Sequence, residues 1–75
     1  MPHPKKPVRY GIVGLGQVSM KGHVPELLNI PDARITALCD PSDEARAQAA
    51  ERLPGATVYQ DYDQLLANDA VDVVL

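Results

Sequence analysis

The sequence predicts an α/β fold built on a doubly wound parallel sheet, and three observations support this prediction. The apolar segment Val8–Val13 runs into a glycine-rich turn, Gly14-Leu15-Gly16. A second apolar segment, Arg34–Cys39, ends directly at an acidic residue, Asp40. Along the chain, short apolar segments alternate with segments of helical periodicity, which is the order that produces parallel strands joined by helices.

Seven elements are expected, in the order β-α-β-α-β-α-β. Strands are expected at 8–13, 34–39, 56–59 and 71–75, with helices at 17–29, from 40–44 to about 53, and from 61 to 68–69. Right-handed crossovers then place the strands in the order 3-2-1-4, with helices on both faces of the sheet. The switch between the first and fourth strands leaves a crevice at their carboxyl ends, where the glycine turn lies.

Local signals refine the helices. Pro25 predicts an initial turn over 17–20 and a firmer helix from about Pro25, because proline disfavours helix at the preceding residue, Val24. Several further positions are assigned a role in a helix. Leu27, Leu28 and Ile30 are expected to face the sheet, Ala45, Ala49 and Leu53 to share one helix face, and Asp61 with Gln64 to form a capping box.

The glycine turn has the spacing of a diphosphate-binding turn. Gly14 permits a tight turn after the strand, and Gly16 lets the backbone come close to a diphosphate. The following helix directs its unpaired N–H groups at the phosphates. Ser19 stands where a third glycine would allow close packing of helix and strand, and it is the one departure from the pattern. An ordinary strand–turn–helix without a ligand is the alternative interpretation.

Asp40 is the candidate ribose ligand. It follows the second strand at close to the spacing, about 20 residues after the glycines, at which an acidic group binds the adenosine ribose hydroxyls. An N-cap of the next helix is a second role for Asp40, and the two roles are compatible because a carboxylate has several acceptor lone pairs. A methyltransferase-type site for S-adenosylmethionine is a further alternative, although a helix-terminal anion site suits a diphosphate better.

Composition excludes several other classes of function. The net charge is −3, with no basic cluster beyond Lys5-Lys6, which argues against nucleic acid as a partner. No apolar run approaches the roughly 20 residues of a membrane span. Residues 1–7 form a proline-rich lead-in, expected to be disordered and without the apolar core of a secretion signal, so a cytoplasmic location is expected.

No metal site is expected. Sites for metal ions need several convergent ligands, and His3 is isolated. His23 is expected to pack and hydrogen-bond locally, and the pair Asp61 and Asp63 to cap a helix in solvent. Cys39, the single cysteine, is expected to be a small buried hydrophobe.

The chain is short for a complete domain. Its 75 residues lie below the usual domain size of roughly 100–150, and its last strand, 71–75, stops without a turn or cap. Residues 8–75 are therefore expected to be the N-terminal portion of a dinucleotide-binding domain, truncated before the catalytic region. Alone, this portion is expected to be marginally stable, which a cooperative thermal melt of the isolated chain would contradict.

The motifs together resemble the N-terminus of the glucose–fructose oxidoreductase and inositol dehydrogenase-like family. The segments that carry the resemblance over residues 8–75 occur in a fixed order. They are Gly11–Gly16, Gly22-His23, Pro25–Leu27, Leu38–Pro41, Tyr59–Tyr62 with Leu65-Leu66, and Val71–Val74. The resemblance implies a Rossmann-type domain that binds NAD, with NADP possible, through Gly14, Leu15, Gly16, Gln17, Val18 and Asp40.

The resemblance also implies properties of a whole protein. Family members are nicotinamide-dependent oxidoreductases of sugars and polyols that form homo-oligomers through a C-terminal α/β domain. Their catalytic Glu-Lys-Pro motif and later His or Asp are absent from residues 1–75, so no catalytic residue is assigned.

The functional prediction is hydride transfer between a nicotinamide cofactor and a sugar- or polyol-like alcohol or carbonyl, with this chain holding the adenosine diphosphate half of the cofactor. Asp40 is expected to favour NAD over NADP, because a 2′-phosphate would meet a like charge. Arg46, one helical turn further on, is the nearest cation that could offset this repulsion. A non-catalytic nucleotide-binding module, such as a redox sensor, is the alternative.

Overall fold

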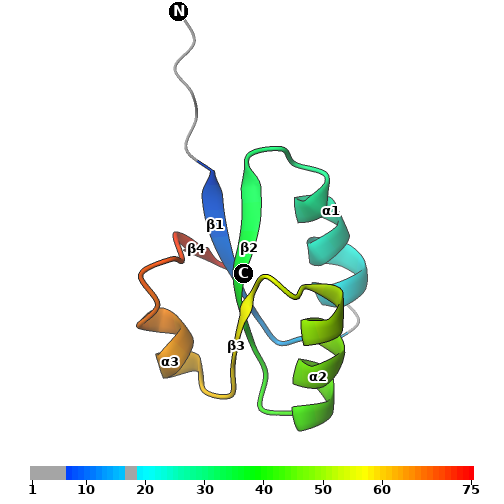
Figure 1. The fold of residues 1–75 in the computed structure, drawn as a ribbon, viewed down its shortest axis with the longest axis vertical. Helices are drawn as coiled ribbons and strands as arrows, with labels where there is room; N and C mark the ends of the chain where they lie inside the picture. The colour runs from blue at the N-terminus through cyan, green and yellow to red at the C-terminus, as the bar shows by residue number, and fades with distance from the viewer. Residues whose placement is uncertain (1–6, 17–18) are drawn as a thin grey trace, which may run out of the picture.

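The computed structural model describes residues 7–16 and 19–75, and its elements alternate along the chain (Figure 1). The strands are β1 (Val8–Val13), β2 (Ala33–Cys39), β3 (Thr57–Tyr59) and β4 (Val73–Val74). The helical elements are the π-helix η1 (Ser19–His23) and the α-helices α1 (Val24–Leu28), α2 (Asp43–Arg52) and α3 (Tyr62–Leu66). The predicted order of elements is confirmed. Of the lead-in at residues 1–7, residues 1–6 lie outside the described residues, so its predicted disorder stays a prediction.

The four strands form one parallel sheet in the order β3-β2-β1-β4, as predicted. Strand β1 pairs with β2 up to Val13 opposite Cys39, and β2 pairs with β3 up to Cys39 opposite Tyr59. Three strands therefore end in register. The residues that follow β1 and β2 lie at the same edge of the sheet, which brings Gly14 and Asp40 together.

The sheet separates two apolar clusters. Helices α1 and α2 cover one face and α3 covers the other (Figure 1). The cluster under α1 and α2 consists of Ile12, Leu15, Val24, Leu27, Ala33, Leu38, Ala49 and Leu53. The smaller cluster under α3 consists of Ala37, Cys39 and Leu65. Both faces are therefore covered near the carboxyl end of the sheet, where the glycine turn leaves it.

The first helical segment differs from the prediction in detail. Pro25 lies in the first turn of α1, as expected. Val24, expected to be non-helical, is helical and fully buried, so its place in the core outweighs the local effect of the following proline. Leu27 is buried, but Leu28 and Ile30 are 59% and 47% exposed, so the expectation that all three face the sheet was wrong. Val24 and Leu27, three residues apart, make the inward face instead.

The later helices also follow the prediction with shorter bounds. On α2, Ala49 and Leu53 are buried and Ala45 packs beside them, which confirms the predicted face. The predicted side-chain capping box of α3 is wrong. Asp61 occupies the N-cap, but its side chain makes no capping bond, and its main-chain oxygen accepts from the Gln64 N–H at 3.2 Å.

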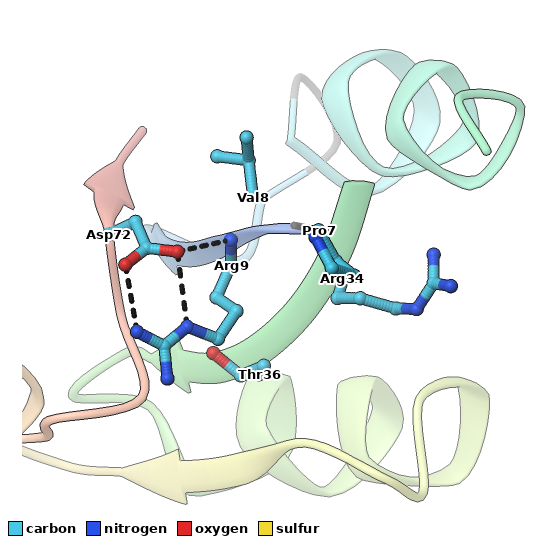
Figure 2. A pocket seen from close by; sticks show the side chains of 6 residues that line it. All are labelled: Pro7, Val8, Arg9, Arg34, Thr36 and Asp72. Carbon is cyan, nitrogen blue, oxygen red and sulfur yellow. Dashed lines mark hydrogen bonds and ion pairs between the residues drawn. The ribbon is translucent and has the colours of Figure 1, made fainter. Parts of the chain in front are cut away.

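The amino edge of the sheet carries an ion pair and an open pocket. The Arg9 guanidinium donates to the Asp72 carboxylate at 2.8 and 3.0 Å, and the Arg9 main-chain N–H donates to it at 2.9 Å (Figure 2). The residues that line this pocket are Pro7, Val8, Arg9, Arg34, Thr36 and Asp72. They lie at or near the starts of β1, β2 and β4, at the opposite edge of the sheet from Gly14 and Asp40.

Across residues 7–16 and 19–75, none of the helices combines the length and apolar character needed to cross a membrane.

Candidate functional site

The glycine turn follows β1, and the main chain of this turn is accessible from outside the protein. Gly14 has a φ of +81°, a left-handed conformation that glycine adopts without strain, and its N–H donates to the Cys39 main-chain oxygen at 2.9 Å. Apart from the chain neighbours of each glycine, a Cβ placed on Gly14 or on Gly16 would meet no atom of the described residues within 4 Å. As far as residues 7–16 and 19–75 are concerned, the space in front of both glycines is therefore open, as the approach of a diphosphate requires.

Leu15 anchors the turn between the two glycines. Its side chain is 5% exposed and belongs to the cluster under α1 and α2. Its main-chain N–H donates to Asp40 Oδ2 at 2.8 Å. The N–H of Leu15, like that of Gly14, is thus already hydrogen-bonded within the protein. The buried side chain and the bonded N–H of Leu15 together fix the turn between Gly14 and Gly16.

Asp40 joins the glycine turn to the start of α2. While Oδ2 accepts from Leu15, Oδ1 accepts from the Ser42 N–H at 2.8 Å. The hydrogen bond from Leu15, then that from Ser42, lowers the pKa of the Asp40 carboxyl below its ordinary value, and the nearby Arg46 charge acts in the same direction. The group is an ionised, half-buried carboxylate, and each oxygen keeps a free lone pair for a ribose hydroxyl.

The helix cap that the sequence placed at Asp40 belongs to Ser42. The Ser42 hydroxyl accepts from the Ala45 N–H at 3.2 Å and caps α2. Asp40 instead accepts from Ser42 across Pro41, a short-range turn that Asp side chains favour. The Asp-Pro-Ser sequence is compatible with both the turn at Asp40 and the cap at Ser42, because Asp and Ser two residues apart can each accept from a different main-chain N–H.

Arg46 lies closer to the candidate site than its helical spacing alone indicated. Its Nη1 donates to the Asp40 main-chain oxygen at 2.7 Å, and its Nη2 pairs with the Asp43 carboxylate. The sequence identified Arg46 as a nearby cation but could not show these two partners. Residues Gln17 and Val18, predicted to offer amides to the diphosphate, lie outside the described residues.

Beyond the glycine turn the helix starts as a π-helix. The Met20 N–H donates to the Gly16 main-chain oxygen at 3.0 Å, and η1 begins at Ser19. His23, expected to pack locally, is exposed instead. Cys39 is 3% exposed and burial raises the pKa of its thiol, which confirms it as a structural residue. Over the part of the chain that the structure describes, no group of three His, Cys, Asp or Glu could hold a metal ion.

Comparison with known proteins agrees with this geometry. A family described as "Oxidoreductase family, NAD-binding Rossmann fold" matches residues 8–75. An inositol 2-dehydrogenase from Corynebacterium glutamicum is 37% identical over 71 residues, which cover 93% of this chain and 21% of the relative. A glycosyl hydrolase family 109 protein from Streptomyces niveus is 39% identical in an alignment 77 positions long, which covers 89% of this chain and 15% of the relative.

Solved structures show the same fold. The WlbA dehydrogenase from Bordetella pertussis, in complex with NADH and UDP-GlcNAcA, matches with a TM-score of 0.84 at 27% identity, over 97% of this chain and 21% of that one. A 3-ketoreductase from Actinomadura kijaniata, in complex with NADP and TDP-benzene, matches with a TM-score of 0.82 at 28% identity, over 92% of this chain and 21% of that one.

This chain spans about a fifth of the length of the inositol dehydrogenases it matches. The match covers every strand and helix of the described fold, together with the glycine turn and Asp40. The resemblance seen in the sequence is therefore confirmed, and the chain belongs to the oxidoreductase family with the NAD-binding Rossmann fold.

Proposed function

We propose that this chain forms the adenosine diphosphate half of the cofactor site of an NAD(P)-dependent oxidoreductase. The observation that carries the proposal is the bond between Asp40 Oδ2 and the Leu15 N–H, because it joins the candidate ribose ligand to the turn that exposes Gly14 and Gly16. The diphosphate would lie against the two glycines and the amides of Gln17 and Val18. The ribose hydroxyls would donate to the free lone pairs of Asp40.

The charge on Asp40 makes NAD the preferred cofactor in this proposal. Hydrogen bonds to Leu15 and Ser42 lower the pKa of Asp40, so the group is ionised at neutral pH. A 2′-phosphate placed beside it would meet a like charge, a repulsion of about 4 kcal/mol at 4 Å with an effective dielectric constant near 20.

The proposal extends to the whole protein of which residues 8–75 would be the N-terminal portion. The described fold supplies the nucleotide half-site, and the nicotinamide supplies the hydride chemistry. No catalytic residue is assigned to this chain, so the acid–base groups would come from beyond Leu75. The relatives named for inositol and the neighbour bound to UDP-GlcNAcA support a sugar- or polyol-like substrate. We further propose that the whole protein is cytoplasmic, forms a homo-oligomer and has no nucleic-acid partner.

Cofactor titration of the complete protein tests the proposal. Dissociation constants for NADH and NADPH are measured for the wild type, for Asp40→Ala and for the control Asp63→Ala, which removes an exposed acid on α3. We expect tighter binding of NADH than of NADPH, and a loss of NADH affinity only in Asp40→Ala. Tighter binding of NADPH by the wild type would show that the role given to Asp40 is wrong.

Turnover separates the enzyme from a non-catalytic module. The complete protein is incubated with NAD and a panel of polyols and sugars, and NADH is followed by its absorbance. We expect the protein to oxidise at least one polyol or sugar of the panel. A protein that binds NADH in an Asp40-dependent way but oxidises or reduces no member of the panel would favour a nucleotide-sensing module.

A further inference from the structure

The cation that contacts the end of β2 beside the candidate ribose ligand is already paired. Arg46 Nη1 donates to the main-chain oxygen of Asp40 at 2.7 Å, and Arg46 Nη2 forms an ion pair with Asp43. The side chain of Arg46 is only 17% exposed, whereas that of Asp43 is 92% exposed. A guanidinium is therefore held against the end of β2, and its charge is balanced by an acid that faces solvent.

We infer that Asp43 is a specificity-determining residue that withholds Arg46 from the 2′-phosphate of NADP. The inference rests on the proposed function, because it requires the ribose to lie at Asp40. An arginine near that position is the usual partner of a 2′-phosphate, and a guanidinium binds phosphate best when two adjacent N–H groups are free. Here Asp40 holds one nitrogen of Arg46 and Asp43 holds another.

The two bonds of Arg46 have different consequences. The bond to the Asp40 main-chain oxygen does not depend on any side chain other than Arg46, so it keeps the guanidinium at the site whatever residue stands at position 43. The bond to Asp43 depends on the carboxylate. Loss of that charge would leave an anchored guanidinium with its Nη2 released beside the ribose and would favour NADP.

Glu44 provides a matched control for Asp43. Both acids lie in the first turn of α2, where they interact similarly with the helix dipole. The Glu44 carboxylate accepts from Gln48 at 3.4 Å and makes no bond to Arg46. Glu44→Gln thus removes the same charge from the same helical turn without releasing the guanidinium.

The experiment measures the ratio of the NADPH and NADH dissociation constants of the complete protein at one ionic strength. The variants are Asp43→Asn, Glu44→Gln, Arg46→Gln and the double variant Asp43→Asn with Arg46→Gln. We expect Asp43→Asn to shift the ratio about fivefold toward NADPH, as for a newly available exposed ion pair. Glu44→Gln and Arg46→Gln alone are expected to shift it less than about twofold, and the double variant to match Arg46→Gln.

Three results would overturn the inference. An unchanged ratio in Asp43→Asn, or an equal shift in Glu44→Gln, would show that pairing with Arg46 does not set specificity. A several-fold loss of NADPH binding in Arg46→Gln alone would show that Arg46 already serves the 2′-phosphate. The variant Asp40→Ala distinguishes these failures from a failure of the proposed function. The proposed function requires Asp40→Ala to lose NADH affinity, whether or not Asp43 sets specificity.

Discussion

Asp40 and Leu15 are joined by a hydrogen bond of 2.8 Å between a carboxylate oxygen and a main-chain N–H. The two residues lie in different connections, one after β1 and one after β2. The residue proposed to bind the ribose therefore also holds the turn proposed to bind the diphosphate. The two halves of the candidate site are therefore coupled by this hydrogen bond. A substitution at Asp40 should alter the conformation of the turn at Gly14 and Gly16.

Replacing Asp40 should weaken folding as well as cofactor binding. Asp40→Ala leaves the N–H groups of Leu15 and Ser42 without their acceptor. Loss of an acceptor from a partly buried donor destabilises by about 1–3 kcal/mol. Urea unfolding without cofactor measures the effect, with Asp63→Ala as the control. Equal unfolding free energies for Asp40→Ala and the wild type would show that the carboxylate does not hold the turn.

The two glycines of the turn should respond differently to alanine. Gly14→Ala forces a φ of +81° on a residue with a Cβ, which costs about 1–2 kcal/mol, although the space around it is open. Gly16 has no positive φ, and apart from its chain neighbours its Cβ would meet no atom of residues 7–16 and 19–75 within 4 Å, so Gly16→Ala should change stability by less than about 0.5 kcal/mol. Its methyl group would instead obstruct the diphosphate and lower NADH affinity.

Urea unfolding and NADH titration of both glycine variants test this contrast. Gly14→Asn should recover part of the stability lost in Gly14→Ala, because asparagine tolerates the left-handed conformation. Full NADH affinity in Gly16→Ala would contradict the close approach of the diphosphate to this residue.

A side chain at Gly11 should lower stability, for a different reason. A Cβ on Gly11 would lie 3.0 Å from Leu65 Cδ2 and 3.2 Å from Val71 Cγ1. Because Leu65 is fully buried, Gly11→Ala should overpack the cluster under α3 and destabilise by about 1–3 kcal/mol. Adding Leu65→Val should restore part of that loss. Gly55→Ala serves as the control, because among the described residues no atom beyond its chain neighbours lies within 4 Å of the added Cβ. Thermal unfolding that is additive for Gly11→Ala and Leu65→Val would argue against the contact.

The ion pair between Arg9 and Asp72 should contribute to acid sensitivity. Hydrogen bonds from the Arg9 side chain and main chain lower the pKa of Asp72 to about 2 in the folded state, from 3.8. Because the pKa of Asp72 is lower in the folded state than in the unfolded chain, its ionised carboxylate stabilises the fold at pH values above about 4. This stabilisation is lost as the pH falls from about 4 toward 2. Asp72→Asn should therefore lose less stability than the wild type over that range. Unfolding midpoints between pH 2 and 5 measure the difference, and parallel curves would contradict it.

Much of the fold and part of the site could be predicted from the sequence, because the signals are local. Alternation of apolar strands with helical segments predicted the strand order β3-β2-β1-β4. The spacing of Gly14, Gly16 and Asp40 predicted that the turn and the acidic residue meet at one edge, and the parallel register confirms it. Signals of this kind depend on backbone conformation and chain direction, which the neighbouring residues largely decide.

Tertiary structure decided which groups are already engaged. The sequence could not show that the Leu15 N–H is taken by Asp40 or that Arg46 is paired with Asp43. Nor could it separate buried Leu27 from exposed Leu28, because both lie within the same helical turn. A hydrogen bond is specified by the relative position of two atoms, and here that position is set by how β1, β2 and α2 pack on one another rather than by the local chain.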